Sequence, residues 1–243
     1  MSAEARPAFY AMARGGWRDY VTVLHPPYTL WHLSYVVIGA ALAPEWHPGR
    51  LGAALVAFFL AVGIGAHALD ELNGRPLGTQ IPDRVLAALA AVSVSAAIAI
   101  GIAGALAHDL WLLAFVAAGG VIVVVYNLEL FGGQLHGDVW FALAWGAFPL
   151  LTAYFAAAGR LRWEAIAAAA FAALSSYAQR SLSTPVRRLR REVAAVSGTI
   201  ELDDGAREAV TRETLIAGNE AALRALSAAF VALAIALVVV RVS

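Results

Sequence analysis

The sequence predicts an all-α protein, a polytopic bundle of helices that crosses a membrane. Of its 243 residues, 61% are hydrophobic and 14% are charged, whereas a soluble globular domain is typically about one quarter charged. The mean hydropathy is +0.72. The run Val85–Ala107 contains no charged residue and is long enough to cross a hydrocarbon core, which needs about 20 apolar residues. We therefore expect one membrane domain over residues 1–243.

The composition also argues against several classes of protein and site. The formal net charge is zero, whereas a nucleic-acid partner demands a basic surface to neutralise its phosphates. The chain has no cysteine, so a disulfide framework and a thiolate metal site are both excluded. The N-terminus lacks the short apolar core and small-residue cleavage site of a signal peptide, so we expect the first spanning helix to direct insertion.

Proline and polar residues bound the first three predicted helices. Residues 1–24 are polar and mildly basic and should form an interfacial lead-in, with Trp17 at headgroup depth. Pro26 and Pro27 begin the first helix, because proline is tolerated in a helical first turn. A charged motif ends the second helix, and a polar loop precedes the third. The predicted helices are Tyr28–Ala43, Leu51–Leu72 and Arg84–Ala107.

Four more helices follow, which makes seven predicted transmembrane spans. A polar, glycine-bearing loop over 129–138 separates the fourth from the fifth, and we expect Pro149 to kink the fifth. Residues 25–182 thus hold six helices, and 219–243 hold the last. Between them, the charged segment 183–218 should lie outside the bilayer as amphipathic helix and turn. The predicted helices are Leu110–Asn127, Val139–Ala158, Trp163–Leu182 and Asn219–Val240.

The distribution of arginine predicts the orientation. Under this helix count, the N-terminal segment, the loop after the second helix and the run Arg180–Arg191 lie on one side of the membrane. The positive-inside rule places that side in the cytoplasm. We therefore expect a protein of the plasma membrane with a cytoplasmic N-terminus and three polar clusters on its cytoplasmic face.

The first cluster lies at the end of the second helix. His67, Asp70 and Glu71 have the spacing of one helical face, and Asn73 and Arg75 follow. Charged groups at the end of a membrane helix are costly and indicate a functional site. Carboxylate oxygens suit Mg²⁺ that bridges to substrate phosphates, and the histidine leaves room for Mn²⁺ or Zn²⁺. The alternative is a helix end whose charges meet water and Arg75.

The second cluster surrounds the loop after the fourth helix. Tyr126, Glu129, His136 and Asp138 would form another wall of the same mouth and supply a base or further metal ligands. The alternative is an ordinary polar loop in which Asp138 caps the fifth helix.

The third cluster consists of arginines. Arg180, Arg187 and Arg188, with Arg190 and Arg191, follow the sixth helix. Guanidinium groups bind phosphate in a bidentate manner. They equally suit the anionic headgroups of membrane lipids, so the pattern leaves both interpretations open.

Aromatic and histidine side chains on the helices predict a central cavity. Tyr28 and His32 on the first helix would reach it, although an interhelical histidine satisfied by neighbours fits as well. Trp145 on the fifth helix would line an apolar ligand channel, for which aromatic packing within the bundle is the alternative.

The motif after the second helix and the sequences of the first and fifth resemble the UbiA superfamily of intramembrane prenyltransferases. The family carries an Asn-Asp-x-x-Asp-x-x-x-Asp motif where this chain has HALDELNGRP, with His67 at the first aspartate and Asp70 at the second. Gly74 stands at the third, beside Asn73. The segments HPPYTLWHLSYVVIGAALA and GDVWFALAWGAFPLLTAY are similar to the family's first and fifth helices. The likeness covers most of Leu24–Leu182.

The resemblance implies that the chain transfers an isoprenyl group from a polyprenyl diphosphate to an unidentified acceptor with a divalent metal, Mg²⁺ first. The chain lacks the family's second aspartate motif, because AQRSLSTPVRRLRR has no carboxylate, and this implies that arginines hold the diphosphate directly. The family commonly has nine helices, against seven expected here. The implied residues are His67, Asp70, Glu71 and Asn73 for the metal, Arg75, Arg180, Arg187 and Arg188 for the diphosphate, and Glu129, His136 and Asp138 for the acceptor proton.

Two other functions remain open on the sequence. One is a metal-dependent intramembrane hydrolase or cyclase built from the same carboxylates and histidines. The other is a catalytically degenerate protein that binds an isoprenoid or another membrane lipid. The prenyltransferase requires Asp70 and a metal, whereas a binding protein should tolerate the loss of that carboxylate.

Overall fold

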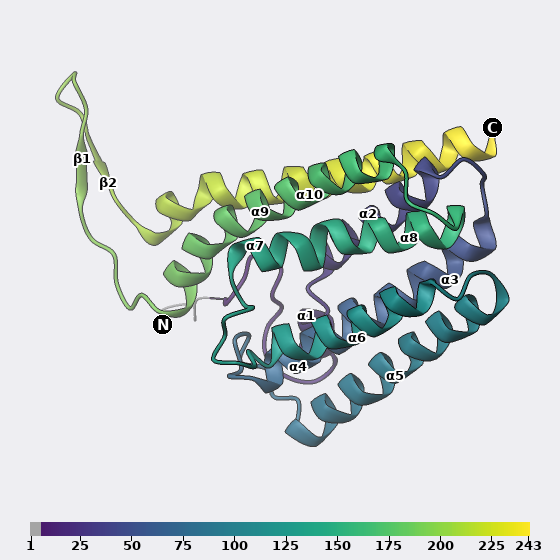
Figure 1. The fold of residues 1–243 in the computed structure, drawn as a ribbon. Coiled ribbons are helices and arrows are strands. Elements are labelled where there is room, and N and C mark those ends of the chain that lie inside the picture. Colours follow the sequence, from purple (N-terminus) through teal and green to yellow (C-terminus); the bar gives the residue numbers. More distant parts are fainter. Residues whose placement is uncertain (1–5) are drawn as a thin grey trace.

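The computed structural model describes residues 6–243 and is a bundle of long helices in two layers (Figure 1). Its elements are α1 (Trp17–Val23), α2 (Pro26–Leu42), α3 (Pro48–Phe58), η1 (Phe59–Ala66), α4 (His67–Leu72), α5 (Asp83–Ala107), α6 (Leu112–Asn127), α7 (Asp138–Phe141), η2 (Ala142–Ala147), α8 (Phe148–Ala158), α9 (Trp163–Arg191), β1 (Thr199–Glu201), β2 (Arg207–Ala209) and α10 (Arg212–Val242). One layer packs α2, α8, α9 and α10 together, and the other packs α3 and η1 with α5 and α6.

Four helices of the described chain are long and apolar enough to cross a membrane, so this is a membrane protein by length and composition. They are Pro48–Leu72, Asp83–Ala107, Asp138–Ala158 and Arg212–Val242. The expectation of seven spans goes further than this. α2 and α6 have 17 and 16 residues, which is short for a span, and α9 is long but less apolar.

The fifth predicted helix contains a π-helical stretch, η2, which ends just before α8, and Pro149 stands in the first turn of α8. Proline has no N–H to donate to the carbonyl four residues earlier, which is that of Trp145. The His32 ring donates to that carbonyl instead, at 2.8 Å. Pro149 thereby helps to position both a histidine and a tryptophan that line the site described below.

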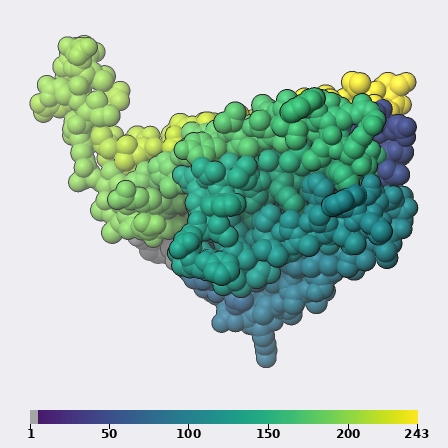
Figure 2. Space-filling view, in the orientation of Figure 1, coloured from purple at the N-terminus to yellow at the C-terminus, as the bar shows by residue number. Residues whose placement is uncertain are grey.

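The segment after the sixth predicted helix differs from the sequence expectation. The helix α9 continues through Pro185 to Arg191, and α10 begins at Arg212, where Thr211 caps it by accepting from the Thr214 N–H. Between them, β1 and β2 form a two-stranded antiparallel hairpin. The hairpin projects away from the bundle (Figures 1 and 2), at the end opposite the C-terminus.

A buried polar network ties α2 to α9 in the core. The Trp31 indole donates to the Tyr35 hydroxyl at 2.6 Å, and the Ser176 hydroxyl donates to the same oxygen at 3.2 Å. Phe230 of α10 stacks on Trp31 with ring centroids 4.7 Å apart. This cluster joins helices far apart in the sequence and stiffens the layer that forms one wall of the site.

The contact between α2 and α8 predicts a strong effect of Gly39→Ala. A methyl group at Gly39 would overlap the backbone carbonyl of Leu150, and backbone cannot move aside as a side chain can. We expect a loss of about 1–3 kcal/mol in the free energy of unfolding, as for overpacked cores, measured by denaturant unfolding in detergent. The control is Gly52→Ala in α3, where nothing lies within 4 Å. An equal loss in both variants would contradict this reading of the contact.

Candidate functional site

A polar cavity of about 120 Å³ lies at the hairpin end of the bundle. Residues from all three polar clusters of the sequence line this cavity, so the clusters lie close together in the fold. The N-terminal segment, α2, η1 and α4, the end of α6 and the end of α9 all contribute. Its chemically active lining residues are Tyr10, His25, Tyr28, His32, His67, Asp70, Tyr126, Asn127, His136, Gln179, Arg180, Arg187 and Arg191.

Arg180 is fully engaged with protein groups. Its Nε donates to Asp138 at 2.7 Å, Nη1 to the Tyr126 hydroxyl at 2.9 Å, and Nη2 to the His136 carbonyl at 3.1 Å. Its guanidinium also lies over the Phe141 ring, 5.3 Å from the centroid. Arg180 therefore fastens the 129–138 loop to α9, and its charge is compensated by Asp138.

Arg187 and Arg191 are cavity cations without a direct ion pair, and the charge of Asp70 acts on both from beyond ion-pair distance. Within residues 6–243, no carboxylate lies at ion-pair distance from either guanidinium. Arg187 donates to the Thr184 hydroxyl at 3.1 Å, and Arg191 donates to the Pro7 carbonyl at 3.3 Å. Burial, with the neighbouring Arg180 and Arg191 charges, lowers the pKa of Arg187 below its ordinary value. Such a pair of half-buried cations is suited to an anion.

The end of η1 and α4 forms the opposite wall. His67 lies against His25 in a stacked pair, with ring centroids 4.2 Å apart and planes at 10°, and the His67 Nδ1 bonds to the Gly63 carbonyl at 3.2 Å. The Tyr10 hydroxyl meets the His25 Nδ1 at 2.7 Å. Burial lowers the pKa of His25 well below its usual value, with the neighbouring His67 adding to the effect. His25 is therefore neutral near pH 7.

Asp70 lies in the same wall and is the carboxylate among the described lining residues of the cavity, where it interacts electrostatically with Arg191, His136 and Arg187. Among the described residues, no group hydrogen-bonds to its side chain. Nor does any group of three or more His, Cys, Asp or Glu side chains within residues 6–243 form a ready metal cage. Mg²⁺ commonly takes only one or two protein carboxylates and completes its shell with substrate phosphates and water. Asp70 therefore fits a metal that arrives with a phosphorylated ligand.

Three residues predicted from the first cluster lie outside the cavity lining. The Glu71 carboxylate is 1% exposed and accepts from the N–H groups of Leu77 and Thr79, at 2.9 and 2.8 Å, and from the Thr79 hydroxyl at 2.9 Å. Asn73 donates to the Asn127 carbonyl at 3.3 Å. Glu71 and Asn73 thus form hydrogen bonds to backbone groups, whereas the sequence predicted that they would be metal ligands.

Arg75 likewise stabilises its own loop. It does not line the cavity, although the sequence predicted it to bind the diphosphate there. It donates to the carbonyls of Thr79 and Ile81, at 3.1 and 2.6 Å, and forms an ion pair with Asp83. Arg188, another predicted diphosphate ligand, is exposed and does not line the cavity. Of the four predicted arginines, Arg187 has the free charge and Arg180 lines the cavity while paired.

The acceptor-side residues separate in a similar way. His136 lines the cavity, stacks on Tyr126 with centroids 4.4 Å apart, and donates from Nδ1 to the Tyr126 carbonyl at 3.0 Å. A carbonyl only accepts, so Nε2 is left as the basic nitrogen. Glu129 lies 3.9 Å from Nε2 and outside the cavity lining, and Asp138 is bound by Arg180. His136 is therefore the predicted base that reaches the cavity.

Sequence reasoning missed several lining residues. Gln179 is 2% exposed, and within the described chain its Oε1 has no hydrogen-bond partner. A buried acceptor without a donor is costly, so Gln179 suits a ligand that carries an O–H or N–H group. The aromatic residues Phe9 and Tyr10 belong to the lead-in that the sequence assigned to the interface. Their only sequence signal was their aromatic type in a polar segment.

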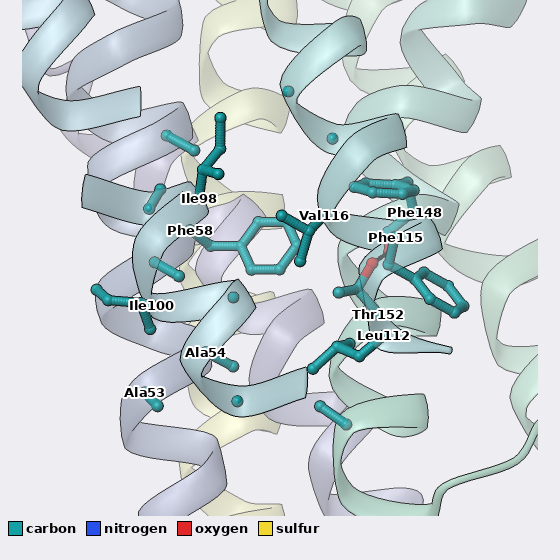
Figure 3. Close-up of a pocket in the computed structure, with 18 of the residues that line it drawn as sticks. Ala53, Ala54, Phe58, Ile98, Ile100, Leu112, Phe115, Val116, Phe148 and Thr152 are labelled. Carbon is teal, nitrogen blue, oxygen red and sulfur yellow. Dashed lines mark hydrogen bonds between the residues drawn. The ribbon is translucent and has the colours of Figure 1, made fainter. Parts of the chain in front are cut away.

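Figure 3 shows a second, apolar cavity of about 200 Å³, which shares two lining residues with the polar one. Its walls come from α3 and η1, α5, α6, and η2 with α8, and they are mostly Ala, Gly, Val, Ile and Phe. In Figure 3, Phe58, Val116 and Leu112 project toward the space between these helices. Both cavities are lined by Val62 and Trp145, so the polar, charged cavity lies next to the apolar one.

No family model matches this chain. Nor does any curated protein or solved structure match it. The site is therefore interpreted from its own geometry and chemistry.

Proposed function

We propose that this protein is a UbiA-like prenyltransferase, which transfers an isoprenyl group from a polyprenyl diphosphate to an acceptor within the membrane. The observation that carries the proposal is that the arginine-lined polar cavity and the apolar cavity lie side by side, with Val62 and Trp145 lining both. A prenyl diphosphate has this amphiphilic shape, with a polyanionic head and an apolar tail. The motif around Asp70 and its likeness to the superfamily support the same function.

In this proposal, the diphosphate lies against Arg187 and Arg191, whose charges have no carboxylate partner among the described residues. Asp70 would hold Mg²⁺ on the other side of the head group. When bound, that metal supplies further positive charge to the departing diphosphate. The arginines act in the same direction, because they stabilise negative charge as it develops on the leaving oxygen.

Transfer breaks the bond between the first prenyl carbon and the diphosphate oxygen, and the electron pair leaves with the diphosphate. An electron pair of the acceptor forms the new bond to that carbon. The acceptor then loses its proton, which the His136 Nε2 would take, and Glu129, 3.9 Å from that nitrogen, would stabilise the imidazolium. Gln179 would accept a hydrogen bond from the acceptor's O–H or N–H group.

The proposed setting is the plasma membrane, with the polar cavity open toward the cytoplasm. The basic end of α9 lies at the cavity, and the positive-inside rule assigns such a cluster to the cytoplasmic side. In this orientation a soluble diphosphate product leaves to the cytoplasm while the prenylated product remains in the bilayer. Membrane lipids are then the protein's other standing partners.

The test is the thermal stability of the purified protein with farnesyl diphosphate, with and without Mg²⁺. A ligand at about 100 times its Kd stabilises the folded state by about 2.7 kcal/mol, which raises Tm by about 5–10 °C for a chain of this size. We expect a shift that requires Mg²⁺ and that Asp70→Asn abolishes.

The matched control is Asp204→Asn, the same substitution in the exposed hairpin turn, which should keep the full shift. A Tm shift that is the same with and without Mg²⁺ and in Asp70→Asn would instead indicate that the protein binds isoprenoids without catalysing transfer. Absence of any shift would refute the prenyltransferase.

A further inference from the structure

Polar groups line one end of the apolar cavity. Arg50 lines this end, and its Nη1 donates to the carbonyls of Ala156 and Ala157, at 3.3 and 3.0 Å. His108, the residue that ends α5, lines it from the facing side. Both residues also border a polar hollow of the opposite bundle end. The apolar cavity therefore runs from one polar compartment to another and has a definite length.

That length follows from helix geometry. On α3 and η1, the lining residues extend from Gly49 to Val62, and on α5 they extend from Val94 to His108. At about 1.5 Å of rise per residue, each stretch spans about 20 Å. An isoprene unit adds four backbone bonds of about 1.5 Å and extends a chain by about 5 Å. The cavity thus accommodates about three to four units in an extended tail.

We propose that Arg50 and His108 form the floor of a chain-length ruler that selects prenyl diphosphates of three to four isoprene units. This inference rests on the proposed function. A longer tail must either press against the Arg50 guanidinium and displace its water, which is costly, or fold back within the helices. A shorter tail fits but leaves apolar wall uncovered. Affinity should rise with each added unit up to this limit and then stop rising.

Small residues on opposite walls allow the ruler to be shortened by design. Gly104 lies one helical turn from His108, which corresponds to about one isoprene unit. A Cβ at Gly104 meets only Leu112 Cδ2 within 4 Å, at an ordinary 3.6 Å, so a larger side chain fills the cavity and does not strike backbone. Ala57, on the facing wall, lies about two isoprene lengths from Arg50.

The experiment measures the Kd values of geranyl, farnesyl, geranylgeranyl and hexaprenyl diphosphate for the full chain with Mg²⁺. The wild type should bind farnesyl and geranylgeranyl diphosphate most tightly, with no gain for hexaprenyl. Gly104→Leu should move the optimum to farnesyl, and Ala57→Leu to geranyl. Each isoprene unit that no longer fits should weaken binding about tenfold or more. Inorganic diphosphate should bind all variants equally.

The control is Ala99→Leu, an exposed position of α5 that does not line the cavity, and it should keep the wild-type order. Ligand-free Tm values identify any variant that is poorly folded. If one of Gly104→Leu and Ala57→Leu is poorly folded, the chain-length preference of the other tests the proposal. Affinity that keeps rising through hexaprenyl, or an unchanged optimum in a folded variant, would overturn the ruler alone. Failure of every diphosphate to bind the wild type would overturn the proposed function as well.

Discussion

Glu71→Ala should cost this protein about 3–5 kcal/mol of unfolding free energy, with or without metal. The Glu71 carboxylate is buried and accepts three hydrogen bonds from the loop that follows α4. Removing a charged acceptor leaves its donors buried and unpaired, at about 1–3 kcal/mol each. Denaturant unfolding in detergent measures the loss. The unfolding free energy of Glu71→Gln should lie between those of Glu71→Ala and the wild type, since one acceptor oxygen remains.

The neighbouring Asp70→Asn provides the control for this prediction. Among the described residues, no hydrogen bond to the Asp70 side chain would be lost, only its longer-range attraction to Arg191 and Arg187, so the same unfolding experiment should show a change of about 1 kcal/mol or less. The two variants should thus separate stability from ligand binding. If Glu71→Ala proves as stable as the wild type but loses Mg²⁺-dependent binding, Glu71 is a metal ligand after all.

Arg187→Gln should weaken the binding of farnesyl diphosphate about tenfold to a hundredfold, because a charge-assisted bond contributes about 1.5–3 kcal/mol. Its stability should stay equal or rise, since the substitution relieves repulsion from Arg180 and Arg191, the charges that help lower the pKa of Arg187. Calorimetric titration gives the affinity, and thermal unfolding without ligand gives the stability.

Arg180→Gln is the matched comparison on the same helix and should behave in the opposite way. It removes the ion pair with Asp138 and the bonds to Tyr126 and His136, so we expect a loss of about 2–4 kcal/mol in stability. Equal affinity losses in both folded variants, with no stability difference, would contradict the division into a ligand-binding and a structural arginine.

The helices were the most predictable part of the fold. Apolar runs, proline at Pro26 and the glycine-bearing loop after α6 are local signals, and local signals place helix ends within a few residues. The charged segment 183–218 differs from the expectation in two ways, because α9 runs on to Arg191 and β1 and β2 form a hairpin before α10. There, α9 continues to Arg191 because its last turns pack on other elements: Arg190 forms a bidentate pair with Glu220 of α10.

The sequence predicted which clusters of residues form the candidate site. It did not predict which of these residues line the cavity and which bind other groups of the protein. Helical spacing placed His67, Asp70 and Glu71 on one face, yet only His67 and Asp70 line the cavity. The loop residues Leu77 and Thr79 return to Glu71 and bind its carboxylate, and spacing carries no information about where a loop returns. Asp19, outside the cavity lining, shows the same limit, because it accepts from the N–H groups of Gly15 and Gln80, and Gln80 lies far away in sequence.

The sequence alone determined that this is an all-α membrane protein whose polar clusters gather at one end, because hydropathy and helical period are local properties of the chain. Only the tertiary structure decided which charges stay unpaired. Arg180 and Arg187 have the same residue type on one helix, but Asp138 reaches only the first. The apolar cavity, too, exists only where small residues of separate helices meet. Pairing and empty space both depend on contacts between segments far apart in sequence.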